Sequence, residues 1–408
     1  MKTPRSFVAH RSFSNIKSGR IPAINCHSPA LFPRKPKMPP KVNSLVFKLT
    51  EYCNLGCSYC YRDNDREKPR VVMPDEIIHE SLQKFAKHIA KTRPDNEHAY
   101  TIWHGGEPLL AGIEKFKRII DLQTRITRES GVIFTNATQT NGVMFDEEWA
   151  QFFKTNDFLV GFSLDGPQHV HDIHRKNKGG NSTFNKTLNA IETSLKYGIP
   201  TNIIAVITNE SSGHANDIYS FLKNSGIKQA DLIPCFDYDG PLTLKPEKYA
   251  AFMLEIAALW KNDGFQPLNF RFLGDIRKRL FQKQTNSGRI AIGCELAGQC
   301  GRNWSLSGRG DVCACECLTP VPRFFLGNIM NMDFEELNSV QGMKEVNDSL
   351  KDIDHKCLKC PVFDICHAGC INRRLKEFNL NGKLDLYCEA RKSIIDFFQK
   401  ETSACQAM

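Results

Sequence analysis

The sequence predicts an α/β protein, an open (β/α)6 partial TIM barrel followed by a smaller cysteine-rich domain. Six β-rich runs alternate with amphipathic helical stretches between residues 42 and 261, which implies parallel strands with right-handed crossovers. Six units fall short of the eight in a closed barrel, so the sheet should stay open. Eleven of the sixteen cysteines lie between Cys294 and Cys405, and this change in composition indicates the second domain.

The strand–helix units follow one another along the chain. The predicted strands are Ser44–Leu49, Tyr100–Trp103, Val132–Thr138, Phe158–Ser163, Asn202–Thr208 and Gln229–Pro234. The predicted helices are Asp75–Lys91, Ile113–Glu129, Phe145–Thr155, Ser182–Tyr197, His214–Asn224 and Pro246–Lys261. Functional residues of such folds lie at the carboxyl ends of the strands.

Composition divides the chain into four parts. Residues 1–41 are a predicted flexible basic tail, with nine Lys or Arg and no Asp or Glu, so the remaining chain carries 54 − 9 = 45 basic and 45 acidic residues. The tail could attract an acidic partner peptide, act as a transit peptide or be merely solvated. We expect the barrel domain at 42–285, the cysteine-rich domain at 286–392 and a C-terminal tail at 393–408.

The composition also limits the classes of function. No run of 18 apolar residues is present, so we expect no membrane span. The start lacks the apolar core of a signal peptide, and so many clustered thiols in a large chain indicate metal ligands in a reducing, cytoplasmic compartment. The chain beyond the tail carries equal numbers of basic and acidic residues, so its net charge does not indicate nucleic-acid binding.

Three cysteines follow the first strand in Cys-Asn-Leu-Gly-Cys-Ser-Tyr-Cys, namely Cys53, Cys57 and Cys60. Three thiolates can hold three irons of a cubane cluster and leave the fourth iron open to a ligand. The alternative is a zinc site, which normally requires four ligands, and the nearest other cysteine in sequence is Cys26. The ligand count therefore favours a cluster.

This loop, with the aromatic Tyr59 before its third cysteine, resembles the cluster loop of the radical S-adenosylmethionine (SAM) enzymes. The next strand ends in His-Gly-Gly-Glu-Pro, where Gly105, Gly106 and Glu107 resemble the motif that holds the methionyl amine of SAM. The resemblance implies SAM as cofactor and a 5′-deoxyadenosyl radical as the reactive species.

Further resemblance concerns the rest of the SAM site. Ser163, in Ser-Leu-Asp-Gly-Pro, and Arg175 resemble the pair that grips the methionine carboxylate, and Asp165 belongs to the same motif. Tyr59 and Phe236 match positions that pack around the adenine. The alternative for the first group is a polar loop with a surface arginine.

The C-terminal cysteines resemble the two-cluster SPASM domain of the anaerobic sulfatase-maturating enzymes. The resemblance implies one auxiliary cluster on Cys294, Cys300, Cys315 and Cys370, and another on Cys357, Cys360, Cys366 and Cys388, which makes three [4Fe-4S] clusters in all. Cys313 and Cys317 are rival ligands to Cys315. A zinc ribbon is the alternative for Cys357 and Cys360.

Two departures from the sulfatase maturases shape the expected function. Glu316 stands where they have an aspartate as catalytic base, and His104 stands where they usually have glutamine. The His-Gly-Gly-Glu-Pro-Leu form resembles more the SPASM enzymes that modify ribosomally made peptides, including those that form cyclophanes, and Glu316 leaves the assignment of the base open. We therefore expect an oxidative side-chain crosslink in a precursor peptide, supported by an external electron donor such as flavodoxin or ferredoxin.

Two other functions stay open, a sulfatase maturase that forms formylglycine and a non-catalytic iron–sulfur electron carrier. The role of Glu316 is open too, since it could merely accept a hydrogen bond near the cluster. Asp237, Asp239 and Asp275 are the next candidates for the base.

Overall fold

The computed structural model describes residues 42–60, 71–93, 98–236, 242–285, 293–375 and 383–404. The described strands are β1 (Ser44–Thr50), β2 (His98–Gly105), β3 (Ile133–Thr140), β4 (Leu159–Ser163), β5 (Thr201–Ile207), β6 (Gln229–Pro234), β7 (Asn269–Phe270), β8 (Asn303–Leu306), β9 (Asp311–Cys313) and β10 (Phe325–Asn328).

The helices of the barrel region are α1 (Asp75–Thr92), α2 (Ile113–Ser130), α3 (Glu147–Thr155), α4 (Gln168–His174), α5 (Phe184–Lys196), α6 (Ala215–Asn224), α7 (Pro246–Asn262) and α8 (Arg271–Thr285). The C-terminal region adds α9 (Cys294–Ala297), α10 (Phe334–Ser339), α11 (Gln341–Lys351), α12 (His355–Leu358), α13 (Phe363–Cys366) and α14 (Cys388–Ala404).

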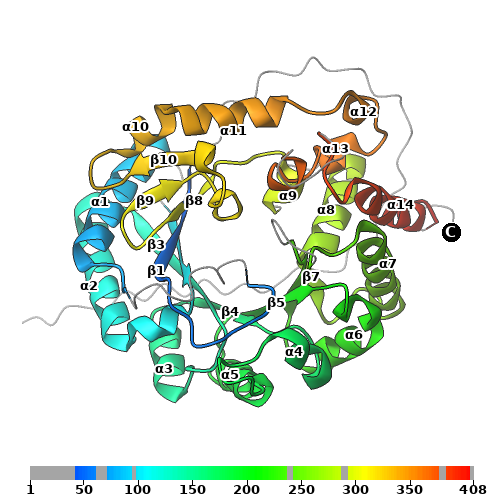
Figure 1. Ribbon diagram of the computed structural model, residues 1–408, viewed down its shortest axis with the longest axis horizontal. Coiled ribbons are helices and arrows are strands. Elements are labelled where there is room, and N and C mark those ends of the chain that lie inside the picture. Colours follow the sequence, from blue (N-terminus) through cyan, green and yellow to red (C-terminus); the bar gives the residue numbers. More distant parts are fainter. Residues whose placement is uncertain are drawn as a thin grey trace, which may run out of the picture. The chain divides into compact units, whose positions relative to one another are not determined.

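One sheet runs through both predicted domains. Its order is β10-β9-β8-β1-β2-β3-β4-β5-β6-β7, and β1 to β7 are parallel. Figure 1 shows the sheet curving inside helices α1 to α7, with its two ends apart. The predicted α/β class and open barrel are confirmed, although the short strands β7 and β8 add two parallel members to the six predicted strands.

Strand β1 is the junction between the two regions. It pairs in parallel with β2 on one side and with β8 of the C-terminal region on the other. All seven of its residues are buried, as expected for a parallel strand covered on both faces. The boundary at 285/286 stays a prediction, because hydrogen bonding continues across it.

Aromatic packing stabilises the barrel wall. Phe116 of α2 contacts Trp149 and Phe153 of α3 with ring centroids 5.2 and 5.9 Å apart, and both pairs are edge-on. These rings are buried, and Phe116 also contacts Trp103 of β2 with ring centroids 6.2 Å apart. Edge-on aromatic pairs contribute about 0.5–1.5 kcal/mol each beyond their buried area.

The C-terminal end differs from the sequence prediction. Residues 393–404, expected to be a tail, continue helix α14, and Ile394, Ile395 and Phe398 are buried. The helix packs on α7, where Lys261 and Glu401 form an ion pair of 2.7 Å. These apolar residues lie on one face of the helix, so the helix is stabilised by burying that face against the barrel.

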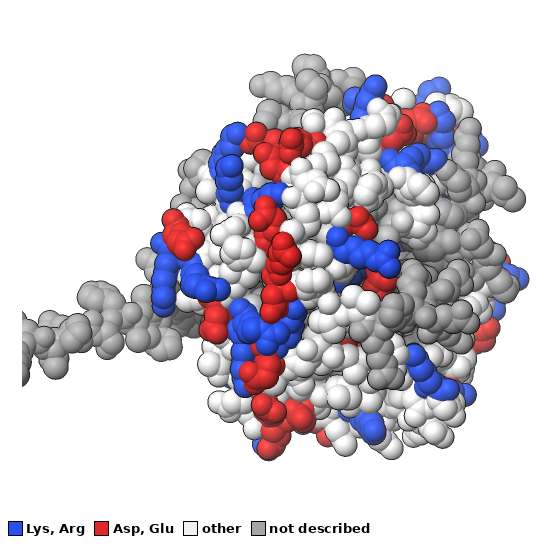
Figure 2. Space-filling view, turned by 60° about the vertical axis from the view of Figure 1, so that its left-hand side comes forward, with Lys and Arg blue, Asp and Glu red and all other residues white. Residues whose placement is uncertain are grey.

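Surface charge agrees with the balanced composition outside the tail. On the side of α1 and α2, acidic and basic side chains are interspersed (Figure 2), as in the ion pairs Lys117–Glu114 and Arg118–Asp75. None of the helices in the described residues combines the length and apolarity needed to cross a bilayer. The predicted basic tail, 1–41, lies outside the described residues.

Candidate active site

The three-cysteine loop leaves the end of β1 and is held against the segment that follows α4. Gly56 N–H donates to the Lys176 carbonyl (2.9 Å), Ser58 N–H donates to the His174 carbonyl (3.3 Å), and Leu55 forms a β-bridge with Asn177. His174 also contacts the Ser58 hydroxyl through Nδ1 at 2.6 Å. The loop is therefore fixed by α4 as well as by β1.

The donor set of this loop fits an iron–sulfur cluster. Burial raises the pKa of Cys53 to about 12 and that of Cys57 to about 11, and the neighbouring thiols add to the effect. Thiols gathered and buried in this way become thiolates only beside cations. Two N–H groups, Leu55 N at 3.5 Å and Asn141 Nδ2 at 3.7 Å, contact the Cys53 sulfur, and hydrogen bonds to sulfur tune cluster potentials.

The glycine pair after β2 packs against the start of the same loop. A Cβ on Gly105 would lie 2.3 Å from the Thr50 carbonyl oxygen, and one on Gly106 would lie 2.2 Å from that of Tyr52. Gly106 N–H donates to Thr50 O at 2.7 Å. The absence of side chains at both positions therefore lets two backbone segments approach each other.

Glu107 is fully buried and ties β2 to the end of β3. Its Oε1 accepts hydrogen bonds from Leu109 N (3.0 Å) and Thr140 Oγ1 (2.8 Å), and its Oε2 accepts one from Asn141 N (2.8 Å). Burial nevertheless raises the pKa of Glu107 to about 7. These bonds occupy three of its roughly four acceptor positions, so a single position is left for the expected methionyl amine.

Tyr59, Asp165 and Arg175 come together from three segments. The Tyr59 hydroxyl donates to Asp165 Oδ2 at 2.6 Å, and Arg175 Nε lies 3.0 Å from Asp165 Oδ1. The Arg175 guanidinium also lies over the Tyr59 ring, 5.3 Å from its centroid. Burial alone would lower the pKa of Arg175, but the Asp165 carboxylate raises it above the usual value. Arg175 is 7% exposed, so the surface-arginine alternative is wrong.

The other two expected SAM contacts lie at strand ends. Ser163 closes β4, and its hydroxyl accepts a hydrogen bond from Gln139 Nε2 at 3.0 Å. Phe236 follows β6 and is half-buried. Both are placed at the carboxyl edge of the sheet, where the sequence predicted the site.

Glu316 forms an ion pair that the sequence did not predict. Its Oε1 lies 3.1 Å from Lys48 Nζ, and its Oε2 accepts a hydrogen bond from the Ser305 hydroxyl. Lys48 lies on β1, its side chain is only 6% exposed, and it also donates to Thr319 Oγ1 at 3.4 Å. The feature of the sequence that could have indicated this pair is a lysine within a mostly apolar strand. Of the other candidate bases, Asp275 accepts from Gly293 N at 2.7 Å, while Asp237 and Asp239 lie outside the described residues.

The first auxiliary set is gathered by the fold. The charges of Cys294, Cys300 and Cys370 act on one another, and Cys300 and Cys370 are half-buried while Cys294 is exposed. Cys315 and Cys317 hydrogen-bond each other, which raises the pKa of Cys315 and lowers that of Cys317. Cys313 instead contacts the Phe324 carbonyl at 3.4 Å and is buried in the apolar core. This geometry keeps Cys317 as a rival ligand and separates Cys313 from the set.

The second auxiliary set lines one small cavity. Cys357, Cys360, Cys366 and Cys388 share it with Val362, Phe363, Ala368, Asp385 and Lys392. The zinc-ribbon alternative concerned Cys357 and Cys360 alone, whereas the cavity is lined by all four thiols. Four thiols on one cavity provide the number of ligands that a cubane needs, and a tetrahedral zinc site needs the same number, so the cluster on this set stays a prediction that rests on the family resemblance.

A buried ion network between the two sets was missed from the sequence. Glu295 pairs with Arg373 (2.5 Å) and Arg391 (3.1 Å), and Arg373 also pairs with Asp385 at 3.1 Å. Burial would raise the pKa of Glu295, but the two guanidinium groups lower it to about 2. Arg391 Nε donates to the Cys366 sulfur at 3.4 Å, and Asp385 accepts from Cys370 N at 2.9 Å. The network therefore positions ligands of both sets.

The comparisons with known proteins agree with this geometry. Residues 47–222 match the family model of the radical SAM superfamily. The cysteine-type anaerobic sulfatase-maturating enzyme of Clostridium perfringens (strain 13 / Type A) is 31% identical over 375 residues, 88% of this chain and 96% of the relative. The serine-type enzyme of Bacteroides thetaiotaomicron is 26% identical over 87% of this chain and 90% of the relative.

Solved structures give the same result. The structure described as native anSMEcpe with bound AdoMet has a TM-score of 0.78 at 27% identity, over 89% of this chain and 99% of that one. Streptococcus suis SuiB bound to S-adenosylmethionine has a TM-score of 0.60 at 16% identity, over 85% of this chain and 77% of that one, and shares the fold. The chain is therefore a radical SAM enzyme, and it belongs to the family of the anaerobic sulfatase-maturating enzymes.

Proposed function

We propose that this enzyme oxidises a cysteine or serine side chain of a peptide to formylglycine. The observation that carries the proposal is the match over 96% of the length of a cysteine-type anaerobic sulfatase-maturating enzyme at 31% identity. A structure of anSMEcpe with a bound Cp18Cys peptide, which has a TM-score of 0.78 to this chain, supports a peptide as substrate. Membership of an enzyme family removes the electron-carrier alternative.

Each group of the site has a part in this reaction. Cys53, Cys57 and Cys60 would hold the cluster that, with SAM, supplies the 5′-deoxyadenosyl radical. Arg175, oriented by Asp165, would hold the SAM carboxylate, and Tyr59 would pack beside the adenine. The eight C-terminal cysteines would hold two auxiliary clusters able to accept an electron.

The overall change is a two-electron oxidation of the side chain. The Cβ of the cysteine or serine gives up a hydrogen atom to the adenosyl radical, and then one electron and one proton leave. From serine the product is the aldehyde. From cysteine it is a thioaldehyde, which takes up water and releases hydrogen sulfide to give the same aldehyde.

A second candidate, an oxidative side-chain crosslink, is supported by two positions. Glu316 replaces the aspartate expected in sulfatase maturases and is held by Lys48, and His104 replaces their glutamine. The crosslink also removes two electrons and two protons, but it forms a bond between side chains and leaves no aldehyde. The comparisons support formylglycine formation better than this reaction.

A sulfatase-derived peptide, in three versions, and a precursor peptide distinguish the candidates. The anaerobically reconstituted enzyme, with dithionite and SAM, is incubated with a sulfatase-derived peptide that carries cysteine, and with the same peptide carrying serine or alanine. We expect an aldehyde, detected by a hydrazide reagent, from cysteine or serine and none from alanine. Production of 5′-deoxyadenosine without any aldehyde would contradict formylglycine formation, and a precursor peptide that loses two hydrogens without gaining an aldehyde would establish the crosslink.

The role of Glu316 is tested with the active peptide. Glu316→Gln keeps shape and hydrogen bonding but cannot take a proton, and a general base contributes about 10²–10⁴-fold. If Glu316 is the base, this variant still makes 5′-deoxyadenosine while product formation falls by that factor. Lys48→Met is the matched control, because it removes the ion pair but keeps the carboxylate of Glu316. Wild-type product formation by Glu316→Gln would leave Glu316 a purely structural role.

A further inference from the structure

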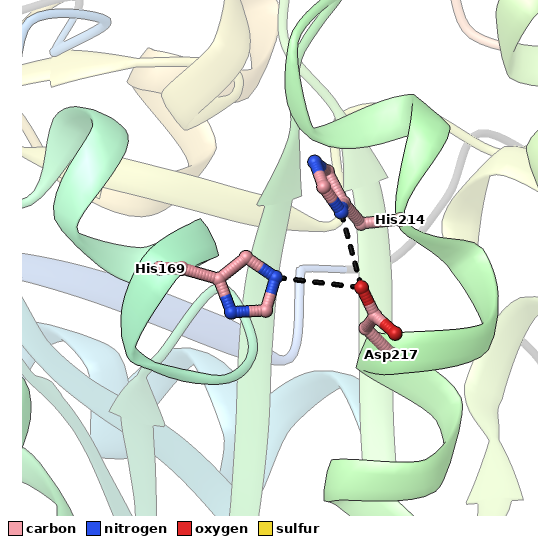
Figure 3. Close-up of side chains that lie close together, drawn as sticks. All are labelled: His169, His214 and Asp217. Carbon is pink, nitrogen blue, oxygen red and sulfur yellow. Dashed lines mark hydrogen bonds and ion pairs between the residues drawn. The ribbon is translucent and has the colours of Figure 1, made fainter.

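His169, His214 and Asp217 form a cluster outside the radical SAM site. Figure 3 shows the two imidazole rings directed at the same carboxylate oxygen. His214 Nδ1 lies 3.1 Å and His169 Nε2 lies 3.4 Å from Asp217 Oδ2, and the ring centroids are 5.1 Å apart. His169 belongs to α4, His214 precedes α6, and Asp217 lies in the first turn of α6.

The fold brings these residues together through a close approach. Gly166, just before α4, has a positive φ of 141°, and a Cβ there would lie 2.9 Å from Cγ1 of Ile218. Ile218 directly follows Asp217, so this glycine lets the start of α4 contact α6. The cluster is thus a product of backbone packing, and its geometry does not depend on long, mobile side chains.

We propose that His169, His214 and Asp217 bind a divalent transition-metal ion of the zinc type. Their three ligand atoms all lie within 4.8 Å of one another. Two ligands about 2.0–2.1 Å from a tetrahedral zinc ion lie about 3.3–3.4 Å apart, and both separations from Asp217 Oδ2 are close to this value. Small shifts of exposed side chains would complete the site.

The chemistry of the ligands selects the class of metal. Imidazole nitrogen suits zinc, copper, nickel and iron, whereas calcium and magnesium require many oxygen ligands. The carboxylate of Asp217, which lies 3.1 Å from His214 Nδ1, adds one oxygen ligand to the two imidazole nitrogens. The three side chains are 39–55% exposed, so water can fill the remaining coordination positions.

A metal at this position would brace the helix that supports the radical SAM site. Helix α4 ends at His174, which contacts Ser58 of the cysteine loop, and Arg175 follows it. An ion shared by α4 and α6 would therefore restrict motion of the segment that carries Arg175. This role is distinct from catalysis and does not depend on which peptide the enzyme oxidises.

The test uses tag-free, anaerobically reconstituted enzyme, in which the clusters occupy their thiols. Zinc is titrated in competition with a chromophoric chelator. We expect the wild type to bind one zinc ion at this site and the His169→Asn/His214→Asn variant not to bind it. Asp217→Asn should bind the ion with an affinity at least about 10–100-fold weaker than that of the wild type. His79→Asn, an exposed histidine on α1, and Asp172→Asn, on α4, are the matched controls and should bind like wild type.

Two further readouts separate a metal site from a triad that is only hydrogen-bonded. Zinc should raise the Tm of wild type and slow amide exchange in residues 168–175 and 214–224, and it should do neither in the double variant. Equal zinc binding by wild type and the double variant would place the ion elsewhere and overturn the proposal. A wild-type protein whose Tm and amide exchange do not respond to zinc would also overturn the proposal.

Discussion

Arg175 illustrates how a buried charge serves both stability and cofactor binding. Arg175→Ala leaves Asp165 without its ion-pair partner, and breaking a buried pair typically costs about 3–5 kcal/mol. The expected contact to the SAM carboxylate is worth about 1.5–3 kcal/mol. We therefore predict a lower free energy of unfolding and SAM affinity reduced about 10–100-fold, measured by denaturant titration and calorimetry.

A second substitution separates the two effects. Adding Asp165→Asn to Arg175→Ala removes the unpaired carboxylate, so part of the stability should return while SAM affinity stays low. Arg309→Ala, on an exposed turn, is the control and should change neither quantity. Wild-type affinity in the double variant would show that Arg175 does not hold the carboxylate.

Glu107 gives a prediction about pH. Burial raises its pKa from the ordinary value of 4.5 to about 7, so between these values the folded state binds more protons than the unfolded state. Stability is then fully present below about pH 4.5 and decreases as the pH rises toward 7, by an amount on the order of 3 kcal/mol. Denaturant unfolding from pH 5 to 8 should show this slope, and Glu107→Gln should flatten it. An identical slope in the variant would assign the pH dependence to other groups.

At the scale of elements, the end of β2 must lie against the start of the cysteine loop. Gly106→Ala would place a methyl group 2.2 Å from the Tyr52 carbonyl oxygen, and backbone cannot give way there as a side chain would. We predict a loss of about 1–3 kcal/mol in the free energy of unfolding and lower iron content in the loop. Gly213→Ala is the matched control, because its Cβ would meet no atom within 4 Å. Equal stability of the two variants would contradict the close approach.

Local sequence patterns suffice to predict some helices and strands of this fold but not others. The six predicted strands all lie within one or two residues of β1 to β6, because β-rich runs between amphipathic helices carry a strong periodic signal. Helix α4 and strand β7 were missed, since seven and two residues are too few for a period to show. Residues 393–404 of helix α14 were taken for a tail, because their apolar side chains become buried only when the helix packs against α7.

At the scale of the whole molecule, the C-terminal region completes the sheet of the barrel. Strand β1 lies between β2 and β8, and Lys48 on β1 is paired with Glu316. A chain that ends at residue 285 would expose one edge of β1 and leave Lys48 buried without its partner. Both the exposed strand edge and the unpaired buried charge would lower the free energy of unfolding. We predict that this truncated chain does not fold cooperatively, as measured by near-UV circular dichroism and analytical ultracentrifugation.

The control for this truncation removes the other end of the chain. The composition of residues 1–41 predicts a flexible tail, so their deletion should leave the unfolding transition unchanged. Cooperative unfolding of the chain that ends at 285 would show instead that the barrel and the cysteine-rich region are independent domains.

The sequence by itself determined the fold class and the three-cysteine loop, because these depend on periodicity and on spacing along the chain, whereas the division of the C-terminal cysteines into two sets is implied by a family resemblance and stays a prediction. Only the tertiary structure decided which charges meet. The pairs Lys48–Glu316 and Arg391–Glu295 join residues 268 and 96 positions apart, and the His169–His214–Asp217 cluster depends on the packing of α4 against α6. Such contacts leave no local pattern, because two side chains distant in sequence become neighbours only when the backbone between them has folded.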